Sequence, residues 1–263
     1  MAFLNIDGRS VAYRLLGAEA NPLVVLAHPL GMTQAVWDDL LPALLPRYRV
    51  LTWDLPGHGA SQAWPADGGE ITPAALAAEA LALVDAAGAA RFHFVGTSIG
   101  GVVGQQLLAE HAERLLTATL TNTGAVIGNA ELWTTRAARV RDEGLAAMAG
   151  EIVPRWFAAE RLKRDPALES GWCIQMARTD AESYARLCEM LGRTDFTGRL
   201  AGRGVRVRLL GGTEDLATPT ATLEALAAEL DGAPLEILEG IGHVPSVELP
   251  GPIAERLQAN LAG

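Results

Sequence analysis

Cysteine and lysine are scarce in this chain of 263 residues, which has two cysteines and a single lysine, Lys163. Two cysteines make no disulfide framework, so a reduced state is expected and Cys173 and Cys188 are predicted to be small buried apolar groups. The five histidines and two cysteines show neither His-x-x-x-His nor Cys-x-x-Cys spacing. The sequence therefore predicts no metal site and no cofactor.

Long hydrophobic runs and a basic excess are also missing. The longest apolar run, around residues 23–27, is far too short to cross a bilayer, and residues 1–15 show no basic leader before an apolar core, so no signal peptide is expected. The net charge of −10 argues against a nucleic acid or an anionic membrane as partner, because both require a basic surface. We therefore expect a soluble cytoplasmic protein that acts on a small molecule, with its oligomeric state left open.

Short buried strands alternate with helices over the first half of the chain. The dipeptide Asp7-Gly8 predicts a hairpin turn, and the helix that follows Thr72 has Pro73 at its first position and ends at Gly88. Further strands are predicted from apolar runs at residues 22–31, 48–59, 91–96 and 116–123. The alternation indicates a parallel sheet with helices on both faces.

From about residue 125 to residue 200 the alternation stops, and helical patterns over residues 131–157, 165–177 and 180–191 follow one another without a strand between them. Strand and helix patterns then alternate again to the end of the chain. The simplest interpretation is one α/β core, formed by residues 1–124 and 201–263, that carries a helical cap, residues 125–200, after its sixth strand.

The stretch GTSIG places Ser98 between Gly96 and Gly100, after a predicted strand and before a predicted helix. In the G-x-S-x-G pattern, this tight turn forces the serine into a strained backbone conformation with positive φ and exposes its hydroxyl at the carboxyl edge of the sheet. The two glycines remove side chains that would collide there. An ordinary glycine-rich turn is the alternative, and the spacing differs from the dinucleotide fingerprint. Ser98 is the predicted nucleophile.

A serine hydroxyl needs a histidine as base, and that histidine needs a carboxylate to orient it. The usual chain order in this architecture is serine, acid, histidine, which leaves His111 and His243. His111 shares the helix that leaves the serine turn, so His243, in the loop after the last strand, is the predicted base. Glu214 and Asp215 follow a strand between the two. We favour Asp215, because a shorter carboxylate suits a fixed contact, with Glu214 as the alternative.

Two backbone amides are expected to bind the oxyanion that develops on the substrate carbonyl. Ile99, directly after the nucleophile, supplies one of them. The other is expected in the loop after the strand at residues 22–27. Pro29 has no N–H there, so Leu30 is the predicted second donor.

Five motifs in this order resemble the α/β-hydrolase fold superfamily over essentially the whole chain: HPLG, WDLPGHGAS, VGTSIGG, GGTEDLATP and GIGHVPSVELP. The resemblance implies a mostly parallel eight-stranded sheet flanked by helices, a helical cap and a Ser-His-Asp triad. The cap is similar to that of 3-oxoadipate enol-lactonases, bacterial enzymes of the β-ketoadipate branch of aromatic degradation. This implies hydrolysis of a small lactone that carries a free carboxylate. HPLG and GTSIGG depart from the NSLG and GLSMGG usual in those enzymes, at positions that line the site.

Two other activities stay open on the same residues. One is a carboxylesterase or carbon–carbon bond hydrolase that uses the same triad, and the other is a non-catalytic ligand-binding member of the fold.

The cap is balanced in charge, with 11 basic and 11 acidic residues, whereas the remainder has 10 and 20. Arginine suits bidentate binding of a carboxylate. The candidates for a substrate carboxylate are Arg136, Arg139, Arg155 and Arg178, with solvated helix faces as the alternative. Trp133 and Trp156 are candidates to wall an apolar pocket, with core packing as their alternative.

Overall fold

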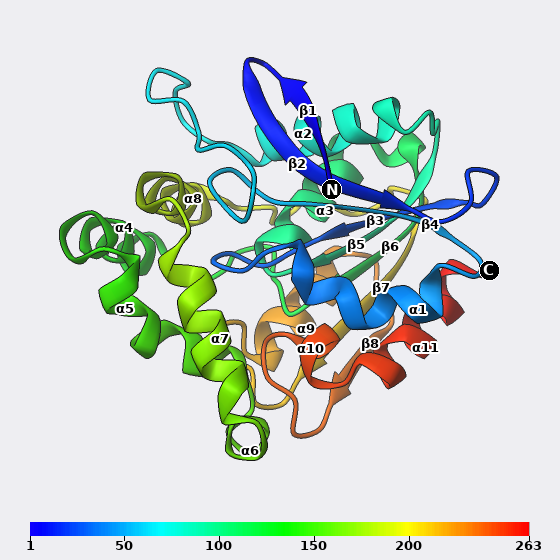
Figure 1. Ribbon diagram of the computed structural model, residues 1–263. Helices are drawn as coiled ribbons and strands as arrows, with labels where there is room; N and C mark the ends of the chain where they lie inside the picture. Colours follow the sequence, from blue (N-terminus) through cyan, green and yellow to red (C-terminus); the bar gives the residue numbers. More distant parts are fainter. Residues whose placement is uncertain (263) are drawn as a thin grey trace.

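The computed structural model describes residues 1–262, with a sheet of eight strands at the centre and helices on both faces (Figure 1). The strand order is β1-β2-β4-β3-β5-β6-β7-β8. Within these residues, β2 is antiparallel to both of its neighbours, β1 and β4, and all other neighbouring strands are parallel. The prediction of a mostly parallel eight-stranded sheet flanked by helices is confirmed.

The strands are short, and the central ones are buried along their whole length. Every residue of β3 and β5 is buried, as expected for parallel strands covered on both faces. The bounds are β1 (Ala2–Ile6), β2 (Arg9–Leu16), β3 (Leu23–Ala27), β4 (Arg49–Trp53), β5 (Phe92–Thr97), β6 (Leu115–Thr121), β7 (Arg206–Gly212) and β8 (Leu235–Leu238).

Helices α2 (Pro73–Ala86) and α3 (Ile99–Glu110) cover one face of the sheet, and α1 (Leu41–Leu44) and α11 (Pro250–Leu261) the other (Figure 1). Two more helices of the core follow strands: α9 (Thr220–Glu229) after β7, and α10 (Pro245–Glu248) after β8. Short 3-10 helices occupy Gln34–Leu40, Ala112–Arg114 and Val153–Trp156.

The predicted local signals at α2 and at the first hairpin are present. The Thr72 side chain accepts a hydrogen bond from Ala75 N at 3.1 Å, Pro73 is the first residue of α2, and Gly88 has φ +73°. Asp7 and Gly8 both have positive φ between β1 and β2, which matches the twist of a two-residue hairpin turn.

Five helices lie between β6 and β7 and form a layer of their own beside the sheet, drawn in green at the left of Figure 1. They are α4 (Ala130–Glu143), α5 (Leu145–Ile152), α6 (Ala159–Arg164), α7 (Pro166–Ala177) and α8 (Ala181–Arg193). α4 packs on α8 and α5 packs on α7. We refer to these helices and their connections as the cap. The division at residues 125 and 200 stays a prediction, and Gly263 lies outside the described residues.

Two details of the cap differ from the expectation. The helical pattern over residues 131–157 is divided, because Gly144 at φ +79° ends α4 and α5 begins directly after it. Cys188 is buried as predicted, but Cys173 is only half-buried, because α7 is an outer helix on which Met176 alone is fully buried.

Helix α3 approaches β3 so closely at Gly100 that a β-carbon there would lie 2.2 Å from the backbone oxygen of Ala27. The obstructing atom belongs to the backbone of a central strand, so no side-chain rotation relieves the clash. We expect Gly100→Ala to lower the free energy of unfolding by about 2 to 3 kcal/mol, measured by urea denaturation.

Gly150→Ala is the matched control, since Gly150 lies in α5 with no atom within 4 Å of an added β-carbon. Its free energy of unfolding should stay unchanged or rise by up to about 1 kcal/mol. Equal stabilities of the two variants would contradict the close approach of α3 to the sheet.

Candidate active site

Three polar side chains singled out in the sequence follow three strands at one edge of the sheet. Ser98 follows β5, Asp215 lies in the loop after β7, and His243 lies in the loop after β8. The strands β5, β6, β7 and β8 are adjacent and parallel, so their carboxyl ends meet at the same edge. In open α/β sheets this edge is where ligands bind.

The Ser98 turn has the geometry that was predicted from Gly96 and Gly100. Ser98 lies between β5 and α3 with φ +57° and ψ −119°, a conformation that costs a non-glycine residue free energy. Two hydrogen bonds hold it there: Ser98 N donates to Thr121 O at 3.0 Å, and Thr123 Oγ1 donates to Ser98 O at 2.9 Å. The end of β6 therefore supports the strained turn after β5.

Asp215 and His243 are in direct contact. Asp215 Oδ2 lies 2.8 Å from His243 Nδ1, and both side chains are almost completely buried. This contact directs the opposite ring nitrogen, Nε2, away from the carboxylate. Glu214, the alternative acid, is exposed and accepts a hydrogen bond from Ala159 N at 3.3 Å instead.

The environment of Asp215 keeps its carboxylate charged. Burial by itself would raise the pKa of Asp215, but His243 and the donors around the carboxylate outweigh burial and hold the pKa well below its usual range. Oδ1 accepts from the backbone N–H groups of Ala217 and Thr218 at 2.8 and 3.0 Å. The charge is therefore stabilised inside the protein.

Two further partners of this carboxylate were not predicted from the sequence. Thr218 Oγ1 donates to Asp215 Oδ2 at 2.6 Å, and Asn122 Nδ2 donates to the same oxygen at 2.8 Å. Asn122 has φ +48° at the end of β6 and also donates to Gly242 O at 3.1 Å. It connects the loop of the acid to the loop of the histidine. The available signal was an asparagine directly after a buried strand, since asparagine tolerates positive φ.

The structure brings Asp215 and His243 together, but among the described residues no hydrogen bond joins Ser98 Oγ to His243. Ser98 is buried beneath the cap, with 7% of its surface exposed. Hydrogen bonds of this kind are commonly long in the absence of substrate and tighten when it binds.

The two predicted oxyanion donors lie next to the serine turn and at the loop after β3. The backbone amides of Ile99 and Leu30 donate to no other described residue. Ile99 is also the first residue of α3, where backbone N–H groups have no partner within the helix.

Two fully buried histidines support the loop that contains Leu30. His28 Nδ1 lies 2.8 Å from Pro29 O, while its Nε2 accepts from Leu55 N at 2.9 Å. His58 Nε2 accepts from Gly31 N at 3.0 Å, and its Nδ1 lies 2.8 Å from Pro56 O. Each ring uses one nitrogen as donor and the other as acceptor, which requires the neutral form.

Burial favours the neutral form of both rings. It lowers the pKa of His28 to about 4 and that of His58 to about 3, with His28 lowering the latter further. The predicted second oxyanion amide therefore lies in a loop that is supported by two neutral imidazoles.

The predicted substrate residues of the cap line one small pocket near the acid loop. Its volume is about 50 Å³, and it is lined by Leu132, Trp133, Arg136, Ile152, Arg155, Trp156 and Ala217. The Arg136 guanidinium lies 5.2 Å from the centre of the Trp133 ring. The Trp156 ring covers the loop after β3, since a β-carbon at Gly31 would lie 3.1 Å from it.

Arg155 is exposed and lines the same pocket as Arg136, whereas the other two arginine candidates do not line it. Arg139 is partly buried and forms ion pairs with Glu143 and Glu151, and Arg178 is exposed. Arg136 is partly buried, and its guanidinium lies over the Trp133 ring of the pocket.

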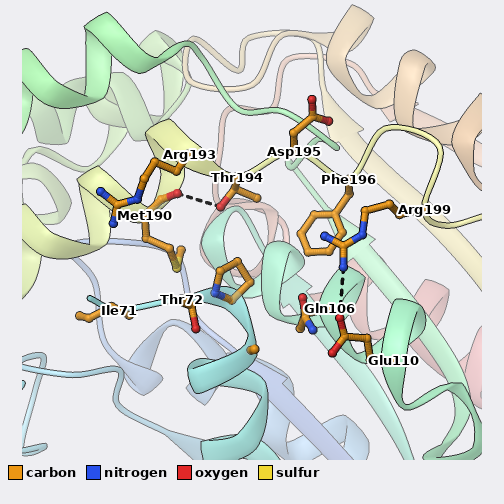
Figure 2. A pocket seen from close by; sticks show the side chains of 12 residues that line it. Ile71, Thr72, Gln106, Glu110, Met190, Arg193, Thr194, Asp195, Phe196 and Arg199 are labelled. Atoms are coloured by element: carbon orange, nitrogen blue, oxygen red, sulfur yellow. Dashed lines mark hydrogen bonds and ion pairs between the residues drawn. The ribbon is translucent and has the colours of Figure 1, made fainter. Parts of the chain in front are cut away.

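A second pocket, of about 340 Å³, lies away from these residues (Figure 2). Its lining combines the ends of α8 and α3 with the start of α2, and it includes none of Ser98, Asp215 and His243. Arg199 faces Glu110 across it at 3.1 Å, and Thr194 donates to the Met190 carbonyl.

Comparison with known proteins places the chain in a family. The model of the alpha/beta hydrolase family matches residues 24–256. This chain belongs to the alpha/beta hydrolase family. It is 30% identical over 238 residues to 3-oxoadipate enol-lactonase 2 of Acinetobacter baylyi, which covers 90% of this chain and 88% of the relative.

Solved structures agree with this assignment. The enol-lactonase from Burkholderia xenovorans LB400 superimposes with a TM-score of 0.94 at 32% identity over 100% of both chains. A hydrolase from Pseudomonas aeruginosa PA01 superimposes with a TM-score of 0.92 at 33% identity, over 100% of this chain and 98% of that one. The predicted family resemblance and the predicted class of enzyme, a hydrolase of carboxylic esters, are confirmed.

Residues 1–262 contain neither a metal-binding cluster nor a membrane-spanning helix. No group of three or more histidine, cysteine, aspartate or glutamate residues lies close enough to hold a metal ion. None of the helices described here has the length and apolar character needed to span a membrane.

The two buried histidines predict an acid-sensitive fold. Their pKa values in the folded protein, about 4 and about 3, lie below the usual 6.5, so below pH 6.5 the unfolded chain binds more protons than the folded one. The free energy of unfolding should therefore fall as the pH decreases from 7 to 4.5, by about 2 to 3 kcal/mol for each ring. Urea denaturation across this range measures the loss.

His58→Gln should be less stable than the natural protein at pH 7 but lose less stability on acidification. The reason is that glutamine removes one of the buried imidazoles that are protonated on acidification. Parallel pH profiles for the two proteins would contradict the role of His58.

Proposed function

We propose that Ser98, His243 and Asp215 are the catalytic triad of a hydrolase that opens a small lactone carrying a carboxylate, with 3-oxoadipate enol-lactone as substrate and 3-oxoadipate as product. The observation that carries the proposal is the buried 2.8 Å contact between Asp215 Oδ2 and His243 Nδ1, at the sheet edge where Ser98 occupies its strained turn. Nucleophile, orienting acid and base follow β5, β7 and β8, in the chain order usual for this architecture.

The first half of the proposed reaction forms an acyl-enzyme. His243 Nε2 takes the proton from Ser98 Oγ as this oxygen bonds to the lactone carbonyl carbon, and the amides of Leu30 and Ile99 stabilise the oxyanion. The ring C–O bond then breaks, and His243 gives its proton to the leaving enol oxygen. Because the substrate is a ring, the leaving group stays tethered to the acyl group on Ser98.

The second half releases the product. His243 accepts a proton from water as the water oxygen bonds to the acyl carbon, and the bond to Ser98 Oγ breaks as that oxygen regains its proton. The charged Asp215 stabilises the imidazolium that forms in each half of the cycle. Every proton removed is returned, so no cofactor is needed.

The choice of substrate rests on the cap and on the relatives. Enol-lactonases align with nearly the whole chain in sequence and in structure. The pocket beside the acid loop combines two aromatic walls, Trp133 and Trp156, with the partly buried cation Arg136. A pocket of about 50 Å³ has room for the carboxylate of a substrate rather than for the whole molecule, and the guanidinium is the group that would pair with that carboxylate. The natural pathway and a cytoplasmic location stay predictions.

Ser98→Ala is expected to lower kcat by several orders of magnitude, since the nucleophile is lost while binding persists. The assay follows freshly generated 3-oxoadipate enol-lactone in the spectrophotometer, beside p-nitrophenyl esters of increasing chain length. Preference for the lactone supports the proposal, whereas preference for long esters identifies a carboxylesterase. Near-natural turnover of either substrate by the variant would refute the assignment of Ser98.

Asp215→Asn should lower kcat by about 10⁴-fold, because the amide no longer holds His243 in the required tautomer. Glu214→Gln is the matched control and should stay within about threefold of the natural protein, since Glu214 makes no contact with His243. The reverse ranking of these two variants would make Glu214 the acid.

Arg136→Gln should raise KM for the carboxylate-bearing lactone by about 10- to 100-fold, because a charge-assisted hydrogen bond to the substrate is lost. KM for the uncharged p-nitrophenyl acetate should change little. Arg139→Gln is the control, since that arginine is paired with Glu143 and Glu151 and does not line the pocket. A similar loss on both substrates would contradict carboxylate binding by Arg136.

A further inference from the structure

One buried carboxylate outside the proposed triad connects the cap to the loop of the histidine. Glu248, the last residue of α10, accepts a hydrogen bond from Gly242 N at 2.8 Å through Oε1. Its other oxygen, Oε2, accepts from Ala158 N at 2.9 Å. Gly242 precedes His243 in the chain, and Ala158 lies in the cap directly before α6. A single side chain therefore bridges two segments that are 84 residues apart in sequence.

The same two segments also touch through their backbones. His243 N donates to Trp156 O at 2.9 Å. A β-carbon at Gly242 would lie 2.8 Å from Ala158 N and 2.9 Å from Glu248 Oε1, so no space separates the histidine loop from the cap. Residues 156–158, Glu248 and Gly242 thus form one packed unit next to His243.

This unit also reaches the predicted oxyanion loop. The ring of Trp156 covers Gly31, directly after Leu30. On its other side the peptide at Gly242 is held by Asn122, whose Nδ2 donates to Gly242 O at 3.1 Å and to Asp215 Oδ2. A displacement of the cap segment at residues 156–158 would therefore move both the backbone of His243 and the Trp156 ring that covers Gly31.

We propose that Glu248 is a positioning residue for the proposed reaction, and that its carboxylate fixes the cap segment at residues 156–158 to the loop that carries His243. The inference rests on the proposed function of His243 as base. Glu248 touches neither substrate nor reacting atoms, and acts through the peptide next to the imidazole. A base must be held within a fraction of an ångström of its productive position, so loosening this bridge reduces turnover.

The bridge depends on the ionised form of Glu248, because only a carboxylate accepts through both oxygens. Burial raises the pKa of Glu248 to about 7, against the opposing effects of the N–H groups of Ala158 and Gly242. Two charged side chains face it from neighbouring elements: Arg161 of α6 lowers this pKa, and Glu214 of the acid loop raises it. Below pH 7 the acid has an O–H that opposes one of the two N–H groups.

Glu248→Gln tests the bridge, because glutamine keeps the shape but accepts through one atom only. With p-nitrophenyl acetate as substrate, kcat of the natural protein should exceed that of the variant by about tenfold at pH 8.5. The ratio should fall towards one at pH 5.5, where the natural side chain is a neutral acid resembling glutamine. Glu255→Gln, an exposed change in α11, is the control and should give a ratio near one at every pH.

A ratio that stays constant across this pH range would overturn the proposal, because a merely structural effect of the substitution has no reason to follow the ionisation of Glu248. If Ser98→Ala keeps natural turnover, the proposed function fails instead. An inactive Ser98→Ala together with a constant ratio removes only the role of Glu248.

Hydrogen exchange in the natural protein tests the same bridge without a variant. The protection of the Ala158 and Gly242 amides, corrected for the intrinsic exchange rate at each pH, should change together between pH 8.5 and pH 5.5, with a common midpoint near pH 7, because both hydrogen bonds end on the same carboxyl group. Protection that is unchanged over this range would overturn the proposal even if the variant failed to fold.

Discussion

The contact between Asp215 and His243 depends on a carboxylate kept charged inside the protein. An ionised group away from water is tolerated only when hydrogen bonds and an opposite charge replace its hydration. Asp215 obtains these from its own loop, through Ala217 and Thr218, and from Asn122 at the end of β6. The carboxyl edges of β6, β7 and β8 are therefore held together by one side chain, and the strained turn after β5 rests on the same strand end.

The cap contributes to this arrangement from the other side. Its segment at residues 156–158 bonds to the backbone of His243 and to Glu248, and the Trp156 ring covers the loop of the predicted oxyanion amide. A helical insertion of this kind is commonly regarded as a cover that selects substrates. In this chain it also forms part of the support of the histidine loop. Trp156 therefore belongs both to the pocket of the cap and to the segment that supports the proposed base.

Three buried histidines have different roles because their hydrogen-bond partners differ. His28 and His58 are surrounded by protein and satisfied by backbone groups on both ring nitrogens, which suits a structural role in the neutral state. His243 is also buried, but its Nδ1 faces the carboxylate of Asp215 instead of a backbone carbonyl. The three rings lie near the same sheet edge, and their environments separate support from the proposed proton transfer.

Several features could be predicted from the sequence because they depend on residues that lie close together in the chain. The turn residues Asp7 and Gly8, the cap residue Thr72 and the glycines around Ser98 act on the backbone within a few residues, so their effects are visible in the sequence. The order of buried strands and helices likewise determined the sheet, because parallel strands require crossover helices.

Contacts between segments far apart in the chain were decided by the tertiary structure alone. The sequence placed Glu214 and Asp215 side by side, but only the folded loop turns Asp215 towards His243 and Glu214 towards Ala159. The positions of Asn122, Thr218 and Glu248 follow from the same cause, since a hydrogen bond between distant segments depends on how strand ends align in space. The sequence by itself determined which local turns and strands form, because those rest on backbone sterics. Which side chains meet was decided by packing, because packing sums contributions from the whole chain.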